Sequence, residues 1–199
     1  MNFGALRVLN DDRVEAGKGF GIHPHKNMEI ISIPLKGKLK HGDSNKNSRT
    51  ITIGDRQTMS AGTGIYHSEM NGSDTEPVEF LQIWVMPEKL NTPPAYRDYD
   101  IRPFLRKNEL ALIVSPDGDA PAKMLQQTWF SIGEIEAGKK IGYHMHQSHA
   151  GVYIFVIEGE VKVDDTVLSR RDGMGVYDTH SFELETLKDS HILLMEVPM

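Results

Sequence analysis

Cysteine is absent from all 199 residues of the chain. This absence excludes disulfide bonds and thiolate metal ligands. The chain also lacks an apolar run of the ~20 residues that a membrane-spanning helix needs, and no signal-peptide pattern opens it. Together these absences predict a cytoplasmic protein that has no contact with membranes.

A surplus of basic residues is also missing. Lysine and arginine number 22 against 28 aspartates and glutamates, which gives a net charge of -6. The densest basic run, residues 102–107, is interrupted by Pro103, Phe104 and Leu105. Proteins that bind nucleic acids usually present a continuous basic surface, so we expect no direct binding of DNA or RNA.

Helical periodicity is the third feature that the sequence lacks, because no sustained 3.6-residue apolar repeat of helix length occurs. Short β-type runs alternate with turn residues instead, at 3–9, 29–35, 50–53, 57–60, 78–86, 109–114 and 128–136. Residues 10–12 are predicted to form a turn and residues 41–48 a polar loop, and Pro34 indicates a sheet edge or a bulge. Many short strands of this kind predict an all-β sandwich or barrel.

An internal repeat divides the chain into two similar halves. Residues 16–25 and 137–146 are identical at six of ten positions, residues 35–40 resemble 157–162, and residues 62–66 resemble 173–177. A proline-rich segment, residues 87–106, lies between the halves and is predicted to be an extended connector. The repeat predicts a duplicated domain, with one β-barrel in residues 1–100 and another in 101–199.

Two short pairs in the first half have the form ligand-x-ligand: His23-Pro24-His25 and His67-Ser68-Glu69. Alternate residues of a strand point to the same face, so each pair directs two metal-binding groups to one point. Nitrogen and oxygen donors without thiolate suit a first-row transition metal with open coordination positions. A closed tetrahedral zinc site is the alternative for a buried set, and a surface pair is the alternative for an isolated His-x-His.

The second half carries a weaker version of the same pattern. If residues 62–66 align with 173–177, Asp178 takes the place of His67 and His180 that of Glu69. His144, His146, Asp178 and His180 would then form a second site, and the alternative is a degenerate site with solvated histidines. His149 is a spare candidate ligand, whereas His191 is expected to be structural.

The glycine context of the two pairs resembles the paired motif of the cupin superfamily. More narrowly, Phe20-Gly21-x-His23-Pro24-His25, Gly37-x-x-x-His41-x-Asp43-Ser44, residues 60–69 (Ser-Ala-Gly-Thr-Gly-Ile-x-His-Ser-Glu) and Gln82-Ile83-Trp84 are similar to the pirin family. The resemblance implies a bicupin of two jelly-roll (double-stranded β-helix) barrels. It also implies one divalent metal, iron(II) first and zinc, manganese, nickel, cobalt or copper as alternatives, on His23, His25, His67 and Glu69. The family generally holds no metal in its second barrel.

Two departures from the family pattern stand out. Family members usually carry a further N-terminal segment that this chain lacks, and Pro34 falls within a strand that the family keeps continuous. The first departure leaves open whether part of the first barrel, or a swapped contact, is missing.

The resemblance also implies an activity. Pirin-like bacterial proteins include quercetin 2,3-dioxygenases, in which the metal acts as a Lewis acid and template and Glu69 would be the general base. Glu29 is expected to orient a ligand imidazole, and His41 and Asp43 to be exposed rather than catalytic. One alternative is a non-enzymatic regulator that binds a protein partner in a redox-dependent way. Another is an enzyme that acts on a different small substrate.

Overall fold

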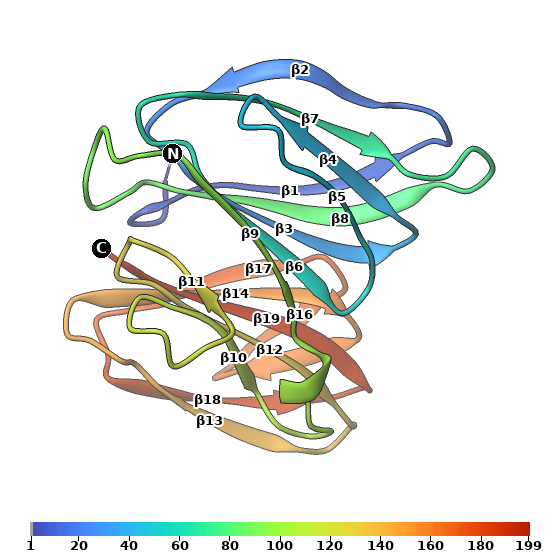
Figure 1. Cartoon of the computed structure of the whole chain (residues 1–199). Helices are drawn as coiled ribbons and strands as arrows, with labels where there is room; N and C mark the ends of the chain where they lie inside the picture. The colour runs from blue at the N-terminus through green and yellow to red at the C-terminus, as the bar shows by residue number, and fades with distance from the viewer. Residues whose placement is uncertain (1) are drawn as a thin grey trace.

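A computed structural model describes residues 2–199, which form two β-barrels stacked one above the other in Figure 1. Apart from a 3-10 turn, η1 (Arg102–Phe104), these residues contain no helix. Consequently no helix in the described part of the chain is long and apolar enough to cross a membrane. The all-β class and the two cupin-like barrels that the sequence predicts are confirmed.

The first barrel consists of a five-stranded sheet, in the order β1-β8-β3-β6-β9, and a four-stranded sheet, in the order β2-β7-β4-β5. Its strands are β1 (Leu6–Val14), β2 (Gly19–His25), β3 (Glu29–Lys36), β4 (Leu39–Asp43), β5 (Ser48–Ile51), β6 (Asp55–Ser60), β7 (Ile65–Asn71), β8 (Val78–Val85) and β9 (Ala95–Asp100).

The second barrel consists of a six-stranded sheet, in the order β11-β10-β12-β19-β14-β17, and a four-stranded sheet, in the order β13-β18-β15-β16. Its strands are β10 (Ala111–Ser115), β11 (Ala122–Lys123), β12 (Trp129–Ile135), β13 (Lys140–His144), β14 (Ala150–Glu158), β15 (Glu160–Val163), β16 (Thr166–Ser169), β17 (Gly173–Tyr177), β18 (Ser181–Thr186) and β19 (Ser190–Pro198).

The two barrels repeat the same strand order, and this corrects one alignment made from the sequence. Residues 173–177 form β17, which pairs with β14 in the way that β6 pairs with β3. The segment is therefore the counterpart of β6 and not of the start of β7. In the first barrel His23 pairs with His67, whereas in the second His144 pairs with Ser181. The expected match of His67 with Asp178 is therefore wrong.

The larger sheets of the two barrels pack against each other through one shared apolar core. Alternate residues of β3 and β8 face this core, and the residues between them face the interior of the first barrel, as the period of two requires. Members of the shared core include Ile31, Ile33, Leu81, Ile83 and Val85 from the first barrel and Ile113, Phe130, Ile132, Leu193 and Met195 from the second. The boundary at residue 100 stays a prediction.

Two segments differ from the sequence prediction because strand pairing overrides local preference. Residues 10–12 continue β1 instead of forming a turn, since they pair with residues 80–82 of β8. Part of the expected connector forms β9, which pairs with β6 along its whole length.

The bulge indicated by Pro34 is confirmed. The pairing of β3 with β8 shifts between Pro34 and Lys36. The pairing of β3 with β6 has already ended at Ser32, so β3 has only one neighbour where the proline lies. Proline lacks the N–H group that a second neighbour would require.

Candidate metal centre

The pairing of β2 with β7 brings three histidines together in the first barrel. His23 lies opposite His67, and a register shift separates this pair from Phe20 and Glu69. The Nε2 atoms of His23 and His67 are 2.9 Å apart. One ring nitrogen from each of His23, His25 and His67 lies within 4.8 Å of the other two. The two ligand-x-ligand spacings therefore deliver a cluster of three imidazoles.

Two ring nitrogens of this cluster have no partner within the protein. His25 Nε2 and His67 Nδ1 are both buried without a hydrogen bond. Burial, together with the neighbouring imidazoles, lowers the pKa of His67 to about 3 and that of His25 to about 4. Neutral imidazoles with available lone pairs are the form that binds metal ions. The cluster therefore fits a divalent transition metal.

Glu69 lies next to the cluster in the interior of the barrel. Its carboxylate is grouped with ring nitrogens of His41 and His67 at separations within 4.8 Å. The Ser32 hydroxyl donates to Oε1 over 2.8 Å, and the Gln82 amide donates to Oε2. Burial raises the pKa of Glu69 to about 7, and the two hydrogen bonds oppose part of that rise. The carboxylate is therefore both positioned and basic enough to accept a proton near neutral pH.

His41 and Asp43 are buried, which contradicts the exposed loop expected from the sequence. The side chains of both residues are fully inaccessible to solvent, because β4 lies between β7 and β5. Gln57 donates to His41 Nδ1 over 3.1 Å, and His41 Nε2 donates to Asp43 over 3.0 Å. The His41 ring also stacks on Tyr96 at a centroid distance of 4.4 Å. Both ring nitrogens of His41 are engaged in hydrogen bonds, so we assign metal binding to the other three histidines. The His41 ring lies beside His67, at a centroid distance of 5.4 Å.

Glu29 does not orient a ligand imidazole, contrary to expectation. Its carboxylate accepts hydrogen bonds from the Ser60 hydroxyl (3.0 Å) and from the backbone N–H groups of Leu125 (2.8 Å) and Gln126 (2.7 Å). The last two residues lie between β11 and β12 of the second barrel. Glu29 therefore joins the two barrels, a role that its position on a strand of the first barrel does not disclose.

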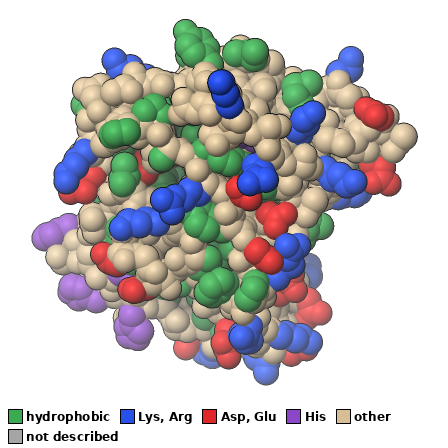
Figure 2. Space-filling model, in the orientation of Figure 1, with side chains coloured by type: hydrophobic (Ala, Val, Ile, Leu, Met, Phe, Trp, Pro, Cys, Tyr) green, Lys and Arg blue, Asp and Glu red, His purple; other side chains and the backbone are tan. Residues whose placement is uncertain are grey.

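The second barrel does not assemble the corresponding site. His144, Asp178 and His180 are exposed, and within residues 2–199 no three donors from this set and His146 lie within 4.8 Å of one another. His146 Nδ1 instead lies 2.7 Å from the buried carboxylate of Glu196. Figure 2 shows histidine side chains on the surface of this barrel. The alternative of a degenerate second site is therefore supported.

The two remaining histidines also lie apart from any group of donors within the described chain. His149 is exposed, and His191 is half-buried on β19 opposite Glu134.

Sequence reasoning missed the residues that support the site from the barrel interior. They are Ser32, Gln57, Gln82, Trp84 and Tyr96, together with His41 and Asp43. Trp84 Nε1 donates to Gln82 Oε1 over 2.9 Å, and Gln82 in turn donates to Glu69, so the three side chains form one chain of hydrogen bonds. One signal was present: Gln82-x-Trp84 and His41-x-Asp43 have the same alternate spacing as the proposed ligands.

Comparison with known proteins supports the fold and the metal site. The chain matches the family models "Pirin" over residues 1–85 and "Quercetinase C-terminal cupin domain" over residues 112–197. It is 38% identical to the quercetin 2,3-dioxygenase of Escherichia coli strain K12, over 100% of this chain and 84% of that relative. It is 35% identical to a putative quercetin 2,3-dioxygenase of Zymomonas mobilis, over 98% of this chain and 83% of that relative.

Solved structures agree with these matches. The crystal structure of YhhW from Escherichia coli superposes with a TM-score of 0.93 at 38% identity, over 100% of this chain and 83% of that one. The structure of the bacterial pirin YhhW in complex with nickel(II) superposes with a TM-score of 0.92 at 36% identity, over 100% of this chain and 84% of that one. With its two matched domains, its cluster of three histidines and these full-length similarities, the chain belongs to the pirin family.

Proposed function

We propose that this protein is a metal-dependent dioxygenase of the pirin type that cleaves a flavonol such as quercetin with O2. One observation carries the proposal: three imidazoles converge, and two of their ring nitrogens are buried without any partner in the protein. The names of its relatives supply the reaction and the small aromatic substrate.

His23, His25 and His67 would hold the metal, and Glu69 would be the fourth ligand. A metal held by these nitrogen and oxygen donors supplies Lewis acidity and a template for substrate and O2. Iron(II) is our first choice, and the nickel complex of a relative supports a divalent ion more broadly. A cytoplasmic location, a protein partner and the absence of nucleic-acid binding stay predictions.

Glu69 is the residue that we assign to proton transfer. Its carboxylate is buried and has a pKa of about 7, which suits acceptance of a proton from a flavonol hydroxyl. Ser32 and Gln82 hold its two oxygens from the interior of the barrel. These contacts fix the orientation of the carboxylate within the barrel.

The test measures metal content by plasma emission spectroscopy and oxygen uptake with quercetin. The wild type, His67→Ala and the exposed control His180→Ala are compared after reconstitution with iron(II). We expect about one metal per chain in the wild type and the control, since the other group of donors in the described residues, His41, His67 and Glu69, shares His67 with the first. We also expect metal and oxygen uptake to disappear together in His67→Ala.

Bound metal without oxygen uptake would contradict the dioxygenase and favour the regulatory protein or another substrate. A content of two metals per chain that falls to one in His180→Ala would show a second metal site in the second barrel. Failure to bind metal at all would overturn the assignment of the ligands themselves.

A further inference from the structure

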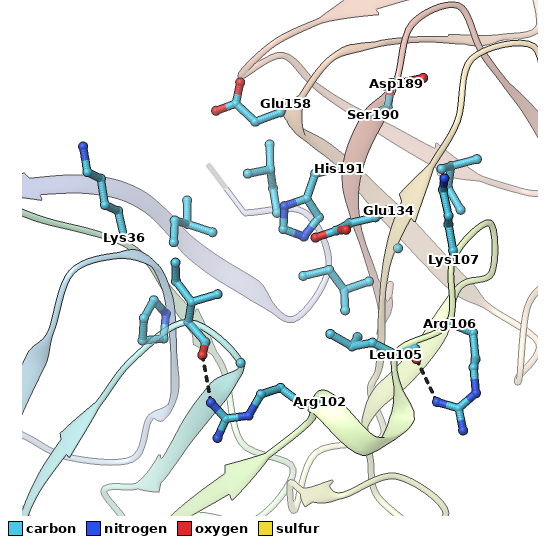
Figure 3. Close-up of a pocket in the computed structure, with 18 of the residues that line it drawn as sticks. Lys36, Arg102, Leu105, Arg106, Lys107, Glu134, Glu158, Asp189, Ser190 and His191 are labelled. Atoms are coloured by element: carbon cyan, nitrogen blue, oxygen red, sulfur yellow. Dashed lines mark hydrogen bonds between the residues drawn. The ribbon is translucent and has the colours of Figure 1, made fainter.

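A cavity of about 900 Å³ lies between the two barrels and away from the histidine cluster, none of whose members lines it. Figure 3 shows that Arg102 and Arg106 reach it from the segment around η1, and that Glu134 and His191 lie in its centre. Apolar side chains complete the walls: Pro34, Leu35, Ile53, Ile132, Ile135 and Ile157.

Arg56, on β6, lines this cavity with a buried and incompletely satisfied guanidinium. The residue is only 4% exposed. Nη1 donates to the backbone oxygen of Asp55 over 2.7 Å, whereas Nε has no hydrogen-bond partner. Within residues 2–199, no carboxylate oxygen lies within 4.0 Å of this guanidinium. A buried charge in this condition is costly unless an anion completes its contacts.

A second arginine lines the cavity from the other barrel. Arg171 lies between β16 and β17, and both its Nε and its Nη1 atoms are buried without a hydrogen bond. It has partial charge compensation, since Nη1 lies 3.3 Å from Asp11 and Nη2 lies 3.4 Å from Glu158. Arginines from both barrels, each with a buried Nε that lacks a hydrogen bond, therefore line the same cavity.

His191 lines the same cavity as the two arginines. Burial lowers the pKa of His191, and Arg56 and Arg171 lower it further, against the opposing effect of Glu134 and Glu158. All three residues line the cavity.

The balance of charge and the apolar walls define the class of ligand. Six lysines and arginines and five aspartates and glutamates line the cavity, a net charge of about one positive unit with His191 neutral. The surrounding carboxylates repel anions of higher charge, such as phosphate dianions. The isoleucine walls favour a ligand with an apolar body.

We propose that the cavity between the barrels binds a small organic monocarboxylate with an apolar body, and that the guanidiniums of Arg56 and Arg171 bind its carboxylate. Arginine presents a planar fork of donors that matches carboxylate geometry. The site is separate from the metal centre, so the proposal does not depend on the dioxygenase activity.

The test is a ¹H–¹⁵N NMR titration of the full chain, loaded with diamagnetic zinc, with benzoate as ligand. Benzyl alcohol tests the need for the charge, and inorganic phosphate tests the preference for a monocarboxylate. The variants are Arg56→Met and Arg171→Met, and the matched control is Arg97→Met, since Arg97 is exposed on β9 and lies outside the cavity. Ile53→Trp narrows the cavity at an exposed position and keeps both guanidiniums, so it tests the site if Arg56→Met fails to fold.

We expect benzoate to shift the amide signals of residues around the cavity, such as Ile53 and Gly133, and to leave those of β7 unchanged. Its affinity should fall about tenfold or more in Arg56→Met, Arg171→Met and Ile53→Trp, and stay the same in Arg97→Met. Shifts confined to the histidine cluster that persist in Arg56→Met would place benzoate on the metal and overturn the proposal. Equal binding of benzyl alcohol, tighter binding of phosphate, or no binding of benzoate would also overturn it.

Discussion

The interiors of the two barrels differ although their strands follow the same order. In the first barrel Ser32 lies opposite Gln82, and both donate to Glu69. In the second barrel the corresponding pair is Ile154 opposite Leu194, and both belong to an apolar core. Each barrel carries a His-x-His pair, but only in the first do polar residues occupy this cross-strand position, and in the second the buried carboxylate of Glu196 holds His146 instead. The comparison teaches that the interior residues decide whether the histidines form a metal site.

Placing the glutamine of position 82 at the corresponding position of the second barrel should cause the largest loss of stability. Leu194→Gln places an amide in an interior that offers apolar neighbours, among them Ile154, Val156 and Leu184. We expect the free energy of unfolding to fall by about 4 kcal/mol, because apolar burial is lost and a polar group is buried without a partner. Urea denaturation measures this loss, and Leu187→Gln, at an exposed leucine, is the matched control. Equal losses in the two variants would contradict the comparison.

Removal of the metal should have the next largest effect and should act through the first barrel alone. A ligand that binds only the folded state at about 100 times its Kd stabilises that state by about 2.7 kcal/mol. Dialysis against a chelator should therefore lower the Tm of the reconstituted wild type in differential scanning calorimetry. His67→Ala lacks one of the three clustered imidazoles, so its Tm should not respond. A response of similar size in His67→Ala would place the stabilising metal elsewhere.

The reverse transfer, Gln82→Leu, gives the first barrel the residue found in the second. It removes one hydrogen bond to Glu69 and the partner of the Trp84 ring nitrogen. Loss of a group that orients a metal ligand typically weakens metal binding about tenfold to a hundredfold. Competition with a fluorescent chelator measures the affinity, and Gln147→Leu in the second barrel is the control. Unchanged affinity in Gln82→Leu would show that Glu69 takes no part in metal binding.

The smallest effect should come from the contact that joins the barrels. Glu29→Gln replaces a carboxylate that accepts two backbone N–H groups from the second barrel and the Ser60 hydroxyl. In the amide only the oxygen accepts hydrogen bonds, because the NH2 group is a donor, so at least one of the three bonds is lost. We therefore expect a loss of about 1.5 kcal/mol in the free energy of unfolding. Urea denaturation should still show one transition because the barrels share a core. The exposed Glu88→Gln is the control, and a loss of equal size there would refute the role assigned to Glu29.

The sequence by itself determined the all-β class, the duplication and the histidine cluster. Each rests on a local rule: short alternating runs predict strands, and the spacing in His23-x-His25 puts two side chains on one face. The alternation also restricts the register between β2 and β7, because a slip of one residue would turn His67 away from the interior of the barrel.

The tertiary structure alone decided which polar residues became buried and where the halves meet. His41 and Asp43 look like loop residues until β4 is placed between β7 and β5, and Glu29 gains its partners from residues almost a hundred positions away. The same holds for Arg56 and Arg171, which meet at a cavity only because the barrels stack. Such contacts depend on pairing and packing between distant segments, and local spacing carries no information about them.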